Sequence, residues 1–164
     1  MLWSVRWIVD GMNVIGSRPD GWWRDRAAAR RRLVGELAAT AQLPPGLRTP
    51  PEAGSSGGES DPVKGTFEND RWPGGPLTVV FDGRDQGGEV TSGAQAGVEV
   101  VFAPGGPDAA DRVIVQMVAS TDDPAGTVVV TSDRALAREV SLAGATVVGT
   151  STLKRLLTPR AGDA

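Results

Sequence analysis

The stretch Trp7-Ile-Val-Asp10-Gly-Met-Asn13-Val-Ile-Gly16 carries the pattern that decides the fold and points to a site. The apolar run over residues 7–9 is typical of a buried strand, and it ends at Asp10 and Gly11, where the backbone can turn sharply. In open parallel α/β sheets, the carboxyl ends of the strands form the crevice that holds ligands. Asp10 is therefore a candidate for contact with a substrate or a metal. The alternative is that Asp10 or Asn13 only satisfies free backbone N–H groups in a turn, as these residue types commonly do.

Two later stretches repeat this pattern of a strand followed by an acid. Residues 77–81 form an apolar run that ends at Asp82, and residues 127–131 form another that is followed by Ser132 and Asp133. Two more strands are expected over 98–102 and 145–148, and apolar spacing predicts helices over 23–42, 107–120, around 136–140 and over 151–157. Because strands that alternate with helices imply right-handed crossovers, the sequence predicts an α/β fold with a mostly parallel sheet.

Two residue types that often carry catalysis are absent, since the 164 residues contain no cysteine and no histidine. Disulfides, thiolate metal sites and Ser-His-Asp catalysis are therefore excluded. Any catalysis has to use carboxylates, hydroxyls, amides, Lys or Arg. The abundance of Asp favours Mg²⁺ or Mn²⁺ with oxygen ligands as the cofactor.

The length predicts one domain, which we place at residues 1–158. Residues 44–76 are rich in Pro, Gly and Ser and have no sustained period, so we expect a flexible insertion there and a loose tail over 159–164. No stretch approaches the ~20 apolar residues that cross a bilayer, and the N-terminus lacks the features of a secretion signal. We therefore expect a soluble, cytoplasmic protein that does not bind a membrane.

Arginines gather directly after a pair of tryptophans, Trp22 and Trp23. The arginines are Arg24, Arg26, Arg30, Arg31 and Arg32. Arginine suits bidentate contacts to phosphate, although a run of charges is more often a solvated helix face. The tryptophans could stack on the bases of a single strand, although such residues more often cover the edge of a core. The net charge of −3 argues against a protein that coats nucleic acid through bulk electrostatics, so local charge matters more.

The predicted parallel sheet brings Asp10, Asp82 and Asp133 to one edge. Asp108 and Asp111 stand three apart at the start of a predicted helix, so both could join that group. Carboxylates that lie close together raise one another's pKa values unless a cation neutralises them. A divalent cation among them could activate water for phosphodiester hydrolysis. The alternative is that Asp133 and Asp108 each cap a helix.

Four motifs follow one another along the chain. They are Val9-Asp10-Gly-Met-Asn13, Val80-Phe81-Asp82-Gly83, Asp108-Ala-Ala-Asp111 and Thr131-Ser-Asp133. In this order they resemble the NYN family of PIN-like ribonucleases, in particular its YacP-like branch, over nearly the whole chain apart from 44–76. The resemblance implies a three-layer PIN-like α/β domain whose central five-stranded sheet has the order 3-2-1-4-5. It also implies a Mg²⁺-dependent endoribonuclease site.

The same resemblance implies a role for each acid. Asp10 and Asp111 would be the main metal-binding acids, and Asp133 would bind metal or orient water. Asn13 would support them as a hydrogen-bond partner, and Asp82 would be an outer member of the site.

One position departs from the family's pattern. The family's helix often carries a Glu four residues after the acid that matches Asp111, whereas this chain has Val115. Asp108, one turn earlier, could compensate for the missing acid.

The leading hypothesis is a metal-dependent endoribonuclease that cleaves single-stranded or loop RNA. Its candidate contacts to the RNA backbone are Arg24, Arg30, Arg31 and Arg84. The alternative, which Val115 favours, is a noncatalytic RNA-binding or ribosome-associated adaptor whose nuclease site has decayed. An Asp-based phosphatase is a weaker third hypothesis, because such enzymes need a second Asp two residues after the nucleophile and this chain has Met12 there.

Overall fold

Six strands form a single sheet in the part of the chain that this computed structural model describes, residues 5–41, 75–84, 93–95 and 97–157. The strands are β1 (Arg6–Asp10), β2 (Leu77–Asp82), β3 (Gly93–Gln95), β4 (Val98–Ala103), β5 (Thr127–Val130) and β6 (Thr146–Val148). Their order across the sheet is β3-β4-β2-β1-β5-β6, and every pair except β3 with β4 is parallel. The central strand β1 is thus paired on both sides.

The predicted order 3-2-1-4-5 is right for the five parallel strands, but the prediction of five strands is wrong. The sixth strand, β3, pairs antiparallel with β4 at the edge of the sheet. It has only three residues, Gly93-Ala-Gln95, which is too short to show an alternating pattern.

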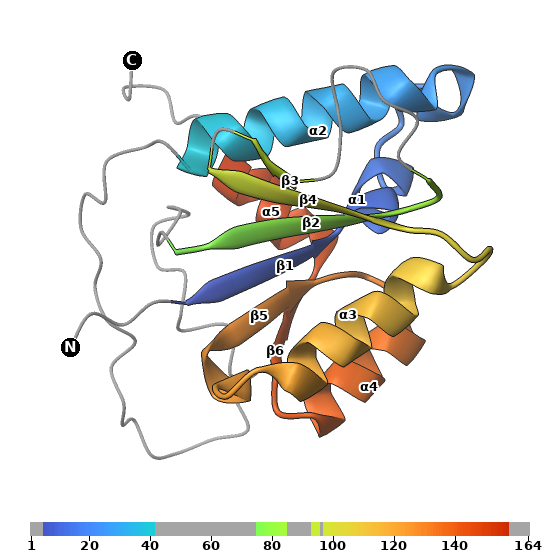
Figure 1. Cartoon of the computed structure of the whole chain (residues 1–164). Coiled ribbons are helices and arrows are strands. Elements are labelled where there is room, and N and C mark those ends of the chain that lie inside the picture. Colours follow the sequence, from blue (N-terminus) through green and yellow to red (C-terminus); the bar gives the residue numbers. More distant parts are fainter. Residues whose placement is uncertain (1–4, 42–74, 85–92, 96, 158–164) are drawn as a thin grey trace.

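Helices cover both faces of the sheet, as a parallel sheet requires. They are α1 (Gly11–Gly16), α2 (Arg26–Ala41), α3 (Ala109–Ser120), α4 (Arg134–Leu142) and α5 (Thr150–Leu157), with short 3₁₀ turns η1 (Trp22–Arg24) and η2 (Pro124–Gly126). In Figure 1, α1, α2 and α5 lie on one face, and α3 and α4 lie on the other. Successive residues of β1 enter opposite cores: Trp7 and Val9 pack under α2, whereas Ile8 packs with α3 and α4.

Three helix predictions need correction. The chain forms the helix α1 directly after Asp10, where only a turn was expected. The helix expected over 23–42 begins at Arg26, because the Asp25 side chain accepts a 2.9 Å hydrogen bond from the Ala28 N–H and so caps α2. The helix expected over 107–120 begins at Ala109, because residue 108 has a φ of +65° and stands outside the helix.

Two of the expected segments lie outside the described residues. These are residues 44–74 of the insertion and the tail at 159–164. Among the helices that the structure describes, none has the length and apolar character needed to cross a membrane.

Candidate acidic site at the carboxyl edge of the sheet

Asp10 is the last residue of β1 and lies at the carboxyl edge of the sheet, next to the start of α1. Only 5% of its surface is exposed, and its Oδ2 accepts a 3.0 Å hydrogen bond from Thr131 Oγ1. The pKa of Asp10 is raised to about 6, chiefly by burial and also by the charges of Asp111 and Asp82, while hydrogen bonds from Thr131 and from the Asn13 backbone lower it. A carboxyl group that titrates near neutral pH is typical of functional sites.

Asp111 lies in the first turn of α3 and is half-buried. Burial raises its pKa above the ordinary value, and the charges of Asp133, Asp108, Asp82 and Glu139 raise it further. Because Asp10 in turn interacts with Asp111 and Asp82, acids from β1, β2, α3 and the loop after β5 share one neighbourhood. The acids that the sequence placed at the ends of separate strands therefore influence one another electrostatically.

The carboxylate that caps the N-terminus of α3 is that of Asp82, not that of Asp108. Asp82, at the end of β2, accepts a 2.9 Å hydrogen bond through Oδ1 from the backbone N–H of Ala110, in the first turn of α3. Asp108 immediately precedes α3 and is exposed, but its side chain makes no capping hydrogen bond. The interpretation of Asp108 as the side-chain cap of α3 is thus wrong. Asp82, from strand β2, accepts from an N–H group of that helix instead.

Asp133 caps α4. Its Oδ1 accepts hydrogen bonds from the N–H groups of Ala135 at 2.8 Å and Leu136 at 3.1 Å. Among the described residues, its Oδ2 takes no hydrogen bond. The capping role suggested for Asp133 is confirmed, and its role toward metal or water stays a prediction.

Asn13 joins α1 to the loop after β5. Its Oδ1 accepts a 2.7 Å hydrogen bond from the Ser132 N–H. The Ser132 hydroxyl lies 2.9 Å from Thr150 Oγ1 and also accepts from the Thr150 N–H at 3.2 Å. One polar chain thus links the beginnings of α1 and α5 to the loop that carries Asp133.

Thr131 connects the two halves of the site, and sequence reasoning missed it. Besides donating to Asp10, Thr131 Oγ1 accepts a 3.1 Å hydrogen bond from the Asp133 N–H. The motif Thr131-Ser-Asp133 placed this hydroxyl two residues before the acid, which is the signal that could have found it. Thr150 had no such signal.

Gly11 allows α1 to pack closely against β2 beside Asp10. A Cβ atom at position 11 would lie 2.5 Å from two ring carbons of Phe81, closer than real Cβ contacts come, and 3.0 Å from the Val80 carbonyl oxygen, which is also tight. Only glycine leaves room for this approach. The first residue after Asp10 is therefore set by packing rather than by chemistry.

The family model of the YacP-like NYN domain matches residues 68–161, which is more than half of the chain. The chain belongs to the YacP-like NYN domain family. The crystal structure of a mutant of Rae1 (YacP) from Bacillus subtilis is similar to this structure, with a TM-score of 0.59. The similarity covers 93% of this chain and 74% of that chain at 21% sequence identity, so it shows a shared fold. No curated protein matches the chain.

Membership confirms the predicted family and gives this NYN domain a PIN-like, nuclease-type fold with a function related to RNA. The matched range contains Asp82, Asp111 and Asp133. It does not contain Asp10 and Asn13, which precede residue 68. The resemblance of the motif Val9-Asp10-Gly-Met-Asn13 to the family therefore stays a prediction.

Val115 lies one turn after Asp111 on α3 of the NYN domain, where an acid was expected. Its side chain is half-buried and packs against the apolar cluster between α3, α4 and the sheet, which includes Ile114 and Leu136. Valine at this position contributes to the core. An acid there would exchange apolar contact for negative charge next to Asp111.

The predicted arginine contacts of the NYN domain lie in two places. Arg84 is exposed two residues after Asp82, at the edge of the sheet that carries the acids. Arg24 and Arg31 are exposed at η1 and α2, whereas Arg30 is half-buried with its guanidinium carbon 6.0 Å from the Phe102 ring centre. Only Arg84 directly follows a strand that ends in the acidic group, and contact of all four with RNA stays a prediction.

The described residues contain no group of three or more acidic side chains that is arranged to hold a metal ion. Mg²⁺, however, usually keeps several waters and binds through one or two carboxylates together with phosphate oxygens of the substrate. Asp10 and Asp111 supply oxygen donors. Burial is the main cause of the raised pKa of each, and a cation would relieve the smaller part that comes from repulsion between the acids. The described residues thus form no closed cage of acids, and the candidate oxygen donors for a cation are the carboxylates of Asp10 and Asp111.

Proposed function

We propose that this NYN domain is an endoribonuclease that hydrolyses phosphodiester bonds of single-stranded or loop RNA with the help of Mg²⁺ or Mn²⁺. The observation that carries the proposal is that the buried carboxyl of Asp10 interacts with Asp82 and Asp111, and that Asp111 interacts in turn with Asp133. In a protein without histidine or cysteine, such a group provides the chemistry that phosphodiester hydrolysis needs.

The acids fall into two groups according to whether they accept hydrogen bonds from the N-terminus of a helix. Asp82 and Asp133 each use one oxygen to hold a helix N-terminus, so they keep α3 and α4 in place around the site. Asp10 and Asp111 would hold the cation, and Thr131 would orient the Asp10 carboxylate through Oδ2. A bound divalent cation would supply a water of lower pKa and positive charge for the scissile phosphate.

The proposal is tested by incubating the purified chain with single-stranded RNA in the presence of Mg²⁺ or Mn²⁺. Asp10→Asn and Asp111→Asn should each lower the cleavage rate roughly 100-fold or more, because a catalytic cation is worth several kcal/mol in the transition state. Asp122→Asn is the matched control: Asp122 is an exposed aspartate that precedes β5, at the opposite edge of the sheet. Cleavage that persists in EDTA, or in both site variants, would refute the proposal.

A noncatalytic RNA-binding or ribosome-associated adaptor is the second candidate. Two observations favour it: no three described acids are arranged to hold a metal, and Val115 fills the position of an expected acid with an apolar contact. RNA binding without cleavage across Mg²⁺, Mn²⁺ and Ca²⁺ would select this function. If the site has merely lost an acid, Val115→Glu should raise cleavage above that of the wild type.

A further inference from the structure

Trp23 leaves 59% of its surface exposed and is, with Leu142, one of two large apolar side chains exposed in the described part of the chain. Its neighbour Trp22 is half-buried and packs against the core beneath α2. The two indole rings meet edge to face, with their centroids 6.1 Å apart and their planes at 86°. The expectation that the pair covers a core edge therefore holds for Trp22 and fails for Trp23.

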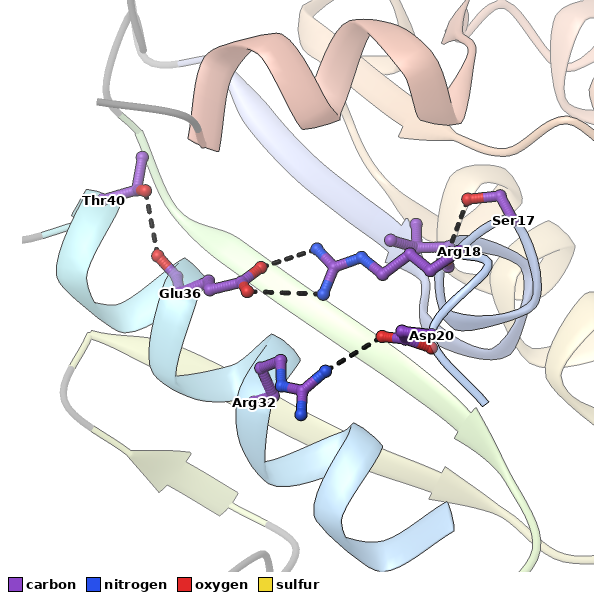
Figure 2. A network of polar contacts seen from close by, with 7 residues as sticks. Ser17, Arg18, Asp20, Arg32, Glu36 and Thr40 are labelled. Carbon is purple, nitrogen blue, oxygen red and sulfur yellow. Dashed lines mark hydrogen bonds and ion pairs between the residues drawn. The ribbon is translucent and has the colours of Figure 1, made fainter. Parts of the chain in front are cut away.

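The segment that leads to these tryptophans is tied to α2 by ion pairs (Figure 2). Arg18 donates to both carboxylate oxygens of Glu36, at 2.6 and 3.3 Å, and its side chain is mostly buried. Asp20 accepts a 2.9 Å hydrogen bond from Arg32. Because these pairs hold the backbone just before Trp22, a ligand that stacks on Trp23 needs to order little of the protein.

Two basic residues closely follow the exposed tryptophan in the sequence. Arg24 and Arg26 are exposed on either side of Asp25, and within the described residues neither forms an ion pair. The Arg26 guanidinium carbon lies 5.7 Å from the centre of the Trp22 ring. Proteins that bind single strands combine these two features, an aromatic face for a base and basic side chains for the backbone.

We propose that Trp23 stacks on an unpaired base of single-stranded RNA while Arg24 and Arg26 contact its phosphates. The inference rests on the proposed action on RNA, and it adds a binding position outside the acidic site. The Trp22 ring lies next to Gly16, the last residue of α1, and α1 begins at the residue after Asp10. A helix of this length spans roughly 9 Å, so one short strand can reach both places.

The test measures binding of a labelled, unstructured single-stranded RNA by fluorescence anisotropy in EDTA, where metal-dependent cleavage cannot interfere. Trp23→Ala should weaken binding roughly 5- to 100-fold, the range expected for the loss of one stacked base. Trp23→Phe should keep most of the affinity, because it keeps an aromatic face. Leu142→Ala is the matched control, since Leu142 is 82% exposed and lies on α4, on the other side of the sheet.

The outcomes separate this inference from the proposed catalysis. If Trp23→Ala loses affinity while no metal supports cleavage, the stacking position stands and the nuclease proposal fails. If the wild type cleaves RNA while Trp23→Ala binds it as tightly as the wild type, the stacking position fails alone. An equal loss of affinity in Leu142→Ala, or an equal effect of Trp23→Ala on duplex RNA, would also overturn the inference. Unchanged thermal melting of Trp23→Ala shows that its effect is not unfolding.

Discussion

Thr131 Oγ1 donates a 3.0 Å hydrogen bond to Asp10 Oδ2, joining two residues that are 121 positions apart in the sequence. Both residues are buried: Thr131 has 2% of its surface exposed and Asp10 has 5%. The same hydroxyl oxygen accepts from the Asp133 N–H. This one side chain therefore couples the central strand to the loop that begins α4.

We predict that Thr131→Val lowers the free energy of unfolding by about 2 kcal/mol, because it leaves a buried carboxyl and a backbone N–H without their partner. Urea denaturation measures this loss. Thr127→Val is the matched control: Thr127 begins β5, is equally buried and donates to the Asp123 carbonyl oxygen at 3.0 Å. Thr127→Val should lower the free energy of unfolding by about 1 kcal/mol and leave RNA cleavage unchanged, whereas Thr131→Val should also impair cleavage. Equal effects of both variants on cleavage would contradict the role given to Thr131.

Asp10→Asn should stabilise the protein at neutral pH. The folded-state pKa of Asp10 is about 6, above its ordinary value of 3.8, so the folded protein holds this proton more tightly than the unfolded chain. The stability that the folded protein gains from the raised pKa of Asp10 is complete below pH 3.8 and is lost as the pH rises to about 6. The variant keeps an oxygen for Thr131 and removes the buried charge, so in EDTA its advantage should reach about 3 kcal/mol above pH 6 and vanish near pH 4. An advantage that is the same at pH 4 and pH 8 would show that the buried charge is not its cause.

Mn²⁺ should raise the melting temperature of the wild type if Asp10 and Asp111 hold a cation. A free Mn²⁺ concentration of about 100 times its dissociation constant corresponds to about 2.7 kcal/mol of added stability. We expect Asp111→Asn to remove this shift. Asp108→Asn should leave most of it, because Asp108 is exposed and stands before α3 begins. Loss of the shift in Asp108→Asn alone would instead assign that residue the compensating role.

Gly11→Ala should destabilise the fold by about 1 to 3 kcal/mol, because its Cβ would press on the Phe81 ring and the Val80 carbonyl oxygen. Gly35→Ala is the opposite case. Gly35 lies inside α2 with nothing within 4 Å of its added Cβ, so the substitution should stabilise the protein by about 0.5 to 1 kcal/mol. Thermal unfolding compares the two variants, and a stabilised Gly11→Ala would refute the close packing of α1 on β2.

The sequence by itself determined the family, the alternation of strands and helices, and the acids at the strand ends. Each of these depends on local patterns: apolar runs for β1, β2 and β5, helical spacing for α3, and an Asp at or shortly after the end of each of those strands. The tertiary structure alone decided how polar groups pair across the chain. It assigned the cap of α3 to Asp82 instead of Asp108, gave Asp10 its partner Thr131, and separated a packed Trp22 from an exposed Trp23. No local pattern contains these pairings, because a hydrogen bond depends on which residues folding brings within about 3 Å, however far apart they stand in the sequence.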